Sequence, residues 1–302
     1  MGLASLVYKK IDQISKNVRY FQKKYKNKLP HVEVEQIGSF TKLTLVGIGQ
    51  SRSYSTAKIV LDALKDVKTE KNFLLRFYIT DKPDEHISDL DFYYCLTSET
   101  RKDFLMPDFA FDGWPEAGIT SFTDTTHQIQ LAGLNPYIDG RIFWIGNVKT
   151  NPIRQKLLEL GNSNTDKFIF KNTFVDDFII HKHEVPYASL PDHCKYKYLI
   201  DVEGNSYSAR LKFLFYSRRV VFIQEREWKE YFHYDLKPYI HFIPVKNDLS
   251  DLISQYEMME SRPELYQEIV DNAYNFATTK LTYNAAIEFM TDNIMKRLNN
   301  EK

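Results

Sequence analysis

The chain has 302 residues, enough for two domains of ordinary size and a substantial buried core. Its charged fraction of 26% is balanced at 40 basic against 40 acidic residues. The apolar fraction of 43% and this charged content exclude a disordered chain. The charge balance argues against a strongly basic nucleic-acid-binding surface, so we expect no nucleic-acid partner. Cys95 and Cys194 are the only cysteines and allow at most one disulfide, so we expect a reducing compartment.

The N-terminal segment lacks the basic region, apolar run and cleavage site of a secretory signal, and no apolar run reaches the roughly 20 residues that span a bilayer. Residues 5–28 are predicted to form a helix with an apolar stripe and a basic face. A solvated helix face is the ordinary interpretation. The alternative is peripheral contact of this basic N-terminal helix with an anionic membrane surface.

Strands and helices alternate in the first half of the chain. Residues 32–37 and 42–48 are strand candidates, and Ser55–Lys65 is an amphipathic helix candidate. Phe73–Ile79 is a strong strand prediction that Pro83 terminates. Gly113, Pro115 and Gly118 then indicate a loop.

A second series of elements begins near residue 141. The predicted strands are 141–146, 198–202, 220–223 and 240–244; the predicted helices are 151–160, 208–216, 248–257 and two or three pieces after Pro263. Strands that alternate with helices on both sides of residue 140 predict an α/β protein with two parallel-sheet domains.

The segment Asp192–Leu249 holds the clearest candidate binding site. Gly204–Ser208 lies at the carboxyl end of a predicted strand and just before a predicted helix that carries Arg210. Ligands of open α/β sheets bind at such strand ends, and the N–H groups at the start of a helix attract anions. Ser206 and Ser208 can donate hydroxyl protons, and Arg210 can bind a diphosphate in bidentate fashion. The alternative is an ordinary capped helix.

The words HCKYKYL, GNSYSARLKFLF and EWKEYFHYDLKPYIHFIPVKNDLSDL of this segment resemble glycosyltransferase family 90. That family contains protein O-glucosyltransferases, fungal capsule-associated xylosyltransferases and bacterial lipopolysaccharide-modifying enzymes. The resemblance implies a GT-B-like α/β fold, in which two Rossmann-like domains with parallel sheets face each other across a cleft. The expected domains are 1–140 on the acceptor side, 141–275 for the UDP-sugar, and 276–302 as a helix that returns to the first domain.

The resemblance also implies a UDP-sugar donor, inversion at the anomeric carbon, and no metal or other cofactor. The donor residues that it implies are Asn205, Ser206, Tyr207, Ser208 and Arg210 in the loop, together with Glu227 of the Glu227–Trp228 pair and Lys149. For Trp228, core packing is the alternative.

Residues 144–150 depart from the family pattern. Ile145 stands where the family has a first arginine, and Lys149 best fits the second, with one extra residue in the loop. Lys149 can neutralise a phosphate as a point charge rather than as a planar fork. Arg154 is a spare candidate nearby.

An inverting transferase needs a carboxylate that removes the proton of the acceptor hydroxyl. FYITDKP resembles the family strand that ends in Asp-x-Pro, which makes Asp81 the implied base; from the residues alone, Asp81 is a turn residue. FAFDGWPEAGI resembles a family loop that faces the acceptor and the sugar. Asp112, Gly113 and Trp114 are its implied contacts, and we expect Arg52 to line the acceptor path.

Three further motifs have other interpretations. Asp89-Leu90-Asp91 has the form of a metal-binding DxD, but we interpret it as a solvated loop. His181-Lys182-His183 lacks the further ligands of a zinc site. His193 beside Cys194 suggests nucleophilic catalysis, although a structural histidine is the preferred interpretation.

We therefore expect transfer of glucose, galactose or xylose from a UDP-sugar to a hydroxyl of a surface-glycan or lipopolysaccharide precursor, lipid-linked acceptors included, in the bacterial cytoplasm at the inner membrane. Transfer to a protein Ser or Thr is one alternative. A catalytically inactive protein that binds a nucleotide sugar or glycan is another, suggested by Ile145.

Overall fold

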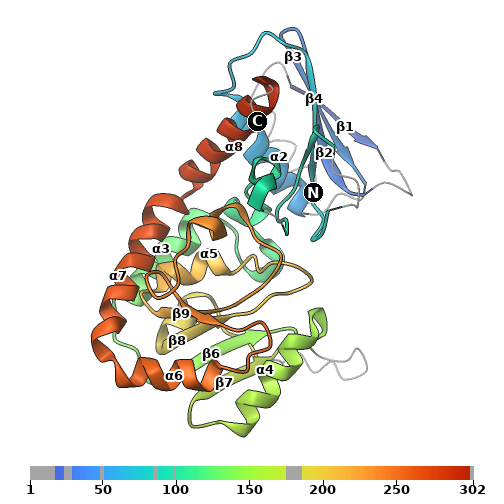
Figure 1. Ribbon diagram of the computed structural model, residues 1–302. Coiled ribbons are helices and arrows are strands. Elements are labelled where there is room, and N and C mark those ends of the chain that lie inside the picture. Colours follow the sequence, from blue (N-terminus) through green and yellow to red (C-terminus); the bar gives the residue numbers. More distant parts are fainter. Residues whose placement is uncertain are drawn as a thin grey trace. The chain divides into compact units, whose positions relative to one another are not determined.

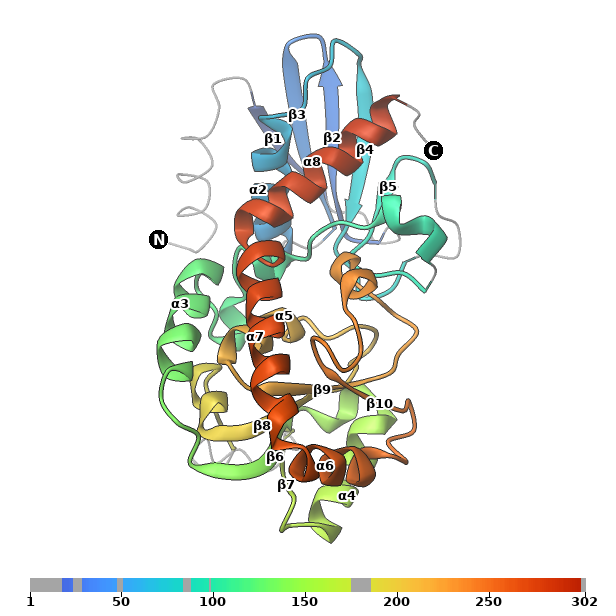
Figure 2. The same cartoon turned by 60° about the vertical axis from the view of Figure 1, so that its left-hand side comes forward.

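The computed structural model describes residues 18–23, 29–47, 51–83, 88–97, 99–174 and 186–299. Within these ranges the chain forms two units, each with one five-stranded sheet (Figures 1 and 2). Unit 1 contains the described residues up to Phe122, Lys229–Tyr231, and those from Tyr283 onward. Unit 2 contains Thr123–Trp228, in its described part, and Phe232–Thr282.

The sheet of unit 1 is mixed. Its order is β1-β3-β2-β4-β5, with β1 (Val18–Lys23), β2 (His31–Ile37), β3 (Phe40–Val46), β4 (Phe73–Tyr78) and β5 (Asp91–Phe92). β2 pairs antiparallel with both β3 and β4, whereas the pairs β1–β3 and β4–β5 are parallel. A link of two residues between β2 and β3, with Gly38 at φ +57°, permits only an antiparallel hairpin. The parallel sheet predicted for this half is corrected accordingly.

The predicted helix 5–28 is wrong where the structure describes it, because Val18–Lys23 forms β1 beside β3. The rest of that segment lies outside the described residues. In unit 1, α2 (Ser51–Leu64) and α8 (Tyr283–Asn299) lie side by side (Figure 2). The hydroxyl of Thr291 in α8 donates to the carbonyl of Ala63 in α2 at 3.1 Å. The structure thus places α8, from the expected returning segment 276–302, within unit 1.

The sheet of unit 2 is parallel in every pair. Its order is β10-β9-β8-β6-β7, with β6 (Asp139–Gly146), β7 (Phe168–Asn172), β8 (Tyr196–Asp201), β9 (Val220–Gln224) and β10 (Ile243–Val245). The five residues of β9, VVFIQ, are all buried, as is typical of a parallel strand covered on both faces.

The helices of unit 2 are α3 (Phe122–Gly133), α4 (Pro152–Ser163), the short α5 (Leu211–Leu214), α6 (Leu252–Ser261) and α7 (Pro263–Lys280). The domain boundary predicted after residue 140 differs from the division at Phe122. The reason is that α3 is bound to unit 2: Arg219 donates to the carbonyl of Gly133 at 3.2 Å, and Tyr274 donates to Gln130 at 2.8 Å.

The GT-B-like α/β fold class is confirmed as two sheet-containing units with helices, one sheet parallel and one mixed. That the two sheets face each other across a cleft stays a prediction. Among the described helices, none has both the length and the apolar character that crossing a bilayer requires.

Candidate active site

The order of the strands in unit 2 creates a point where the chain changes direction. From β6 the chain passes to β7 on one side and then returns to β8 on the other side of β6. Ligands of open parallel sheets bind outside the carboxyl ends of the strands at such a switch point. The segments that leave β6 and β8 here are residues 147–151 and 202–210, which contain most of the predicted donor residues.

Asn151 joins these two segments. Its Oδ1 accepts the N–H of Ile153 at 3.0 Å and so caps α4, as the sequence predicted for the Asn151–Pro152 start. Its Nδ2 donates to the carbonyl of Gly204 at 2.8 Å. The start of a 12-residue helix is therefore held against the loop that follows β8.

Arg154 makes a second and stronger connection from the first turn of α4. Its Nε donates to Glu203 O at 2.8 Å, its Nη1 to Asn147 O at 3.1 Å, and its Nη2 to Val202 O at 3.3 Å. The guanidinium lies 5.6 Å from the ring centroid of Trp144 and is 8% exposed. Because it binds main-chain carbonyls of both loops, Arg154 fixes the spacing between the carboxyl ends of β6 and β8.

A buried ion pair between Asp201 and Arg226 stabilises the loop after β8. Asp201, the last residue of β8, is 1% exposed. Its Oδ1 accepts the hydroxyl proton of Ser208 at 2.6 Å, and its Oδ2 lies 2.8 Å from Nη1 of the buried Arg226. Arg226 also donates to the carbonyls of Asp201 at 3.0 Å and Gln224 at 3.1 Å. The loop is thus tied to β8 and β9 at once.

Arg210 reaches the end of β6. Its Nη1 donates to the carbonyl of Ile145 at 2.5 Å. A Cβ at Gly146 would lie 3.3 Å from Arg210 Nη2 and 2.8 Å from Cζ2 of Trp144, so this position has no room for a side chain. Burial lowers the pKa of the Arg210 guanidinium, and the nearby Asp201 opposes that effect. A cation therefore stands at the end of β6, beside Ile145.

The predicted helix 208–216 is corrected. The helix α5 contains only Leu211–Leu214 and passes into a 3₁₀ turn, Phe215–Ser217. A helix dipole is the sum of aligned peptide units, so one turn contributes little of it. Attraction of an anion to this edge must come from side-chain charge and from α4, not from α5.

The other predicted donor residues differ in exposure. Lys149 is exposed in the 3₁₀ turn Val148–Thr150, with its Nζ 5.2 Å from the ring centroid of Phe174. Glu227 is exposed beyond β9. In the loop, Ser206, Tyr207 and Ser208 are buried and Asn205 is exposed. Their predicted contacts with a donor stay predictions.

In unit 1 the structure brings together residues from three predicted segments. Nη1 of Arg52, in the first turn of α2, lies 2.7 Å from Oδ1 of Asp81, which follows β4. The guanidinium of Arg52 also lies 4.6 Å from the ring centroid of Phe109 and 6.0 Å from that of Trp114. The thiol of Cys95 contacts the carbonyl of Asp81 at 3.2 Å. Asp81 is thus held on both its side chain and its main chain.

The loop after Phe109 is anchored to the same helix. Ser55 Oγ donates to Oδ2 of Asp112 at 2.9 Å and to Gly113 O at 3.3 Å, while Lys58 Nζ lies 3.1 Å from Oδ1 of Asp112. A Cβ at Gly113 would come within 3.1 Å of the carbonyl of Thr120, which favours glycine here. The predicted acceptor residues therefore gather around the first half of α2. Sequence reasoning missed Ser55 and Lys58.

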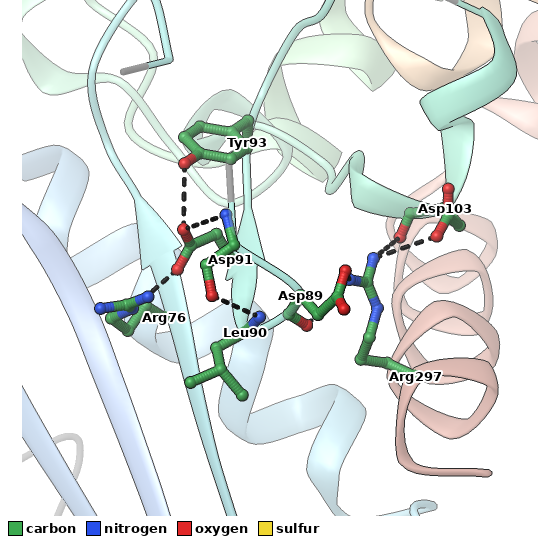
Figure 3. A network of polar contacts seen from close by, with 8 residues as sticks. Arg76, Asp89, Leu90, Asp91, Tyr93, Asp103 and Arg297 are labelled. Atoms are coloured by element: carbon green, nitrogen blue, oxygen red, sulfur yellow. Dashed lines mark hydrogen bonds and ion pairs between the residues drawn. The ribbon is translucent and has the colours of Figure 1, made fainter. Parts of the chain in front are cut away.

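The second aspartate of the DxD motif, Asp91, is buried in a network of polar contacts (Figure 3). Asp91 is 2% exposed, and its carboxylate accepts from Arg76 Nε at 2.7 Å, Ser88 N at 3.0 Å and Tyr93 OH at 3.3 Å. The interpretation of a solvated loop is therefore wrong for Asp91. Burial and these partners explain why an aspartate stands at the start of β5.

Asp89 differs from Asp91, since its side chain is 92% exposed and its carboxylate lies 3.8 Å from Arg297 of α8. Arg297 also pairs with Asp103 at 3.1 Å (Figure 3). Within the described ranges, no three His, Cys, Asp or Glu side chains are grouped so that they could hold a metal ion. The triplet 181–183 lies outside those ranges.

His193 and Cys194 are buried in the 3₁₀ turn Pro191–Lys195, just before β8. Burial, reinforced by Arg210, lowers the pKa of His193 to about 4, and its Nδ1 is 2.8 Å from the carbonyl of Ser189. Burial raises the pKa of the Cys194 thiol to about 11, whereas a nucleophilic cysteine requires a lowered pKa. These values favour the structural interpretation of both residues.

A parallel α/β unit with a basic switch point is typical of proteins that bind nucleotides or their conjugates. The family model described as Glycosyl transferase family 90 matches residues 48–297, and the chain belongs to this family. The predicted resemblance is thereby confirmed.

Curated relatives of this chain include three O-glucosyltransferases. Protein O-glucosyltransferase 1 of Rattus norvegicus is 36% identical over 138 residues, 44% of this chain and 35% of that protein. Protein O-glucosyltransferase 2 of Danio rerio is 28% identical over 63% of this chain and 39% of its own length. O-glucosyltransferase rumi of Drosophila melanogaster is 40% identical over 30% of this chain and 22% of its own length. The chain thus matches between 22% and 39% of the length of these relatives.

Among solved structures, the Anabaena HepE protein in complex with UDP-glucose aligns over 97% of this chain and 84% of its own, with 9% identity and a TM-score of 0.42. The C-terminal domain of a glycosyl transferase group 1 family protein from Francisella tularensis aligns over 51% of this chain and 92% of its own, with 14% identity and a TM-score of 0.34. The family assignment rests on the sequence match and not on these likenesses.

Proposed function

We propose that this family 90 member transfers a sugar from a UDP-sugar to a hydroxyl group, with inversion and without a metal ion. The observation that carries the proposal is the switch point of unit 2, where loops from β6 and β8 are held together beside Arg210. An anionic ligand at this edge would meet the guanidinium of Arg210, and a guanidinium is a charged donor of the kind that binds a diphosphate.

In the proposed reaction, the acceptor oxygen forms a bond to the anomeric carbon while the bond from that carbon to the phosphate oxygen breaks. Asp81 accepts the proton of the acceptor hydroxyl, and UDP leaves with the electron pair. Arg210 stabilises the charge that develops on the diphosphate. The contact with Arg52 at 2.7 Å orients the Asp81 carboxylate.

For the acceptor, we propose the hydroxyl of a surface-glycan or lipopolysaccharide precursor, met in the bacterial cytoplasm at the inner membrane. Trp114, partly exposed next to Arg52, offers a flat face on which a sugar ring can stack. A Ser or Thr of a protein is the second candidate, favoured by the names of the curated relatives. A panel of oligosaccharides and peptides, each tested for incorporation of labelled sugar, separates the two.

The competing hypothesis is a protein that binds nucleotide sugars without turnover. The test is release of UDP from UDP-glucose, UDP-galactose and UDP-xylose with this acceptor panel, in the presence of EDTA. We expect turnover by the wild type and a loss of about 100-fold or more in Asp81→Asn. Asp89→Asn, which changes an aspartate with a side chain 92% exposed in the same unit, is the control and should remain active. Turnover by Asp81→Asn at the wild-type rate would eliminate Asp81 as the base.

A further inference from the structure

The switch point of unit 2 contains more buried positive charge than negative charge. Arg154 and Arg226 are 8% and 4% exposed, and the half-buried Arg210 lies at the same edge of the sheet. In the described part of this edge, the buried carboxylate is that of Asp201, which is 1% exposed. Glu203, on the same edge, is partly exposed and therefore better hydrated.

The three arginines divide their contacts unequally. Arg226 is paired with Asp201 at 2.8 Å, so its charge is locally neutralised. Arg210 and Arg154 instead donate to main-chain carbonyls, which carry partial charge only. Burial, and then the neighbouring Arg210, lowers the pKa of Arg154 to about 10, which still leaves it charged at neutral pH.

A buried cation whose hydrogen bonds go to main-chain carbonyls, and not to a paired carboxylate, costs free energy. The same charge attracts an anion strongly, because little water lies between them to screen it. Such an arrangement is expected where a ligand supplies the missing negative charge. The four-residue α5 provides little dipole at this edge, so the attraction comes from side-chain charge and from the start of α4.

We propose that Arg154 is a positioning residue for the diphosphate of the donor. It fixes the spacing between the loops 147–151 and 202–208, and its buried guanidinium adds positive charge next to them. The inference rests on the proposed function, since it assumes that a nucleoside diphosphate occupies the switch point. Arg154 needs no direct contact with the phosphates, because its donors are directed to Glu203, Asn147 and Val202.

Arg219 provides a matched control in the same unit. It is 5% exposed, and it donates to the carbonyls of Cys194 at 2.9 Å, Gly133 at 3.2 Å and Asn135 at 2.6 Å. The carbonyls that accept from Arg219 precede β8 and β6. Arg219 therefore connects two loops at the amino ends of the strands, as Arg154 connects two loops at their carboxyl ends. Arg219→Met and Arg154→Met therefore remove equivalent packing and hydrogen bonds, but at opposite edges of the sheet.

The experiment measures the dissociation constants of uridine, UMP, UDP and inorganic pyrophosphate for the full chain by calorimetry, with folding checked by circular dichroism. We expect Arg154→Met to weaken UDP and pyrophosphate by about tenfold or more and uridine by less than about twofold. The loss should grow from uridine to UMP to UDP. Arg154→Lys, which keeps the charge but cannot bridge three carbonyls, should recover part of the UDP affinity, and Arg219→Met should weaken all four ligands equally or not at all.

The outcomes separate this inference from the proposed function. If the wild type turns over a UDP-sugar, and Arg154→Met binds UDP with the same affinity as the wild type, the role of Arg154 is refuted and the proposed function stands. An equal loss for uridine and UDP in Arg154→Met, or the same profile in Arg219→Met, would reduce Arg154 to a structural residue. A folded Arg154→Met that shows the phosphate-dependent loss supports the inference even where no acceptor is yet known. A wild type that binds neither UDP nor pyrophosphate overturns both.

Discussion

The two aspartates of the DxD motif should differ sharply in their effect on stability. In Asp91→Asn the side chain keeps its size but loses the charge that Arg76 contacts at 2.7 Å, and three donors lose a charged acceptor. Breaking a buried ion pair costs about 3–5 kcal/mol. The side chain of Arg76 is 29% exposed and can be partly rehydrated, so we expect a loss of about 2–3 kcal/mol in the free energy of unfolding. In Asp89→Asn we expect less than about 0.5 kcal/mol, since the ion pair is exposed and 3.8 Å long.

The assay is equilibrium unfolding in urea, followed by circular dichroism, of both variants and the wild type. Activity with and without Mn²⁺ is measured on the same preparations. Equal stability losses in the two variants would refute the structural assignment of Asp91. It would also be refuted if Asp91→Asn kept its stability but lost a metal-stimulated activity, because the motif would then act as a metal ligand.

Two further predictions concern unit 2. The pKa of His193 is about 4 in the folded state and about 6.5 in the unfolded state, so the unfolded state binds more protons between these pH values. The free energy of unfolding should therefore fall by up to about 3 kcal/mol as the pH drops from about 6.5 to about 4. His193→Gln should flatten that part of the stability–pH curve; an unchanged slope would assign it to other groups. Gly133→Ala should lower stability by about 1–3 kcal/mol, since the new Cβ would lie 2.5 Å from Ser217 O, whereas Gly140→Ala, with nothing within 4 Å, should be nearly neutral. Thermal unfolding of both glycine variants checks this difference, which equal melting temperatures would contradict.

The elements predicted correctly are those with long apolar runs or clear caps. Phe73–Tyr78 and Asp139–Gly146 alternate or run apolar, and Asn151–Pro152 starts α4 as expected. The helix predicted for residues 5–28 is wrong in Val18–Lys23 because its rough apolar spacing fits a helix, while pairing with β3 selects a strand. The two residues of β5 are too few to produce a recognisable period.

The candidate site was predictable only where a resemblance identified the residues. Arg52, Asp81 and Asp112 come from segments far apart in sequence, and their convergence around α2 depends on the sheet order of unit 1. Asp201 and Arg226 went unnoticed because they are separated by a whole βαβ connection, and buried charges have no sequence pattern that distinguishes them from surface charges.

The path of the chain between the units limits how the protein can be divided. The chain passes from one unit to the other at 122/123, 228/229, 231/232 and 282/283. A single cut therefore releases neither unit with its full set of elements, and removal of the last 20 residues would strip α8 from the helix it contacts, α2. Separate expression of unit 2 would need both ends trimmed and one internal junction from Trp228 to Phe232, and a gene fragment that ends at residue 275 should yield insoluble protein.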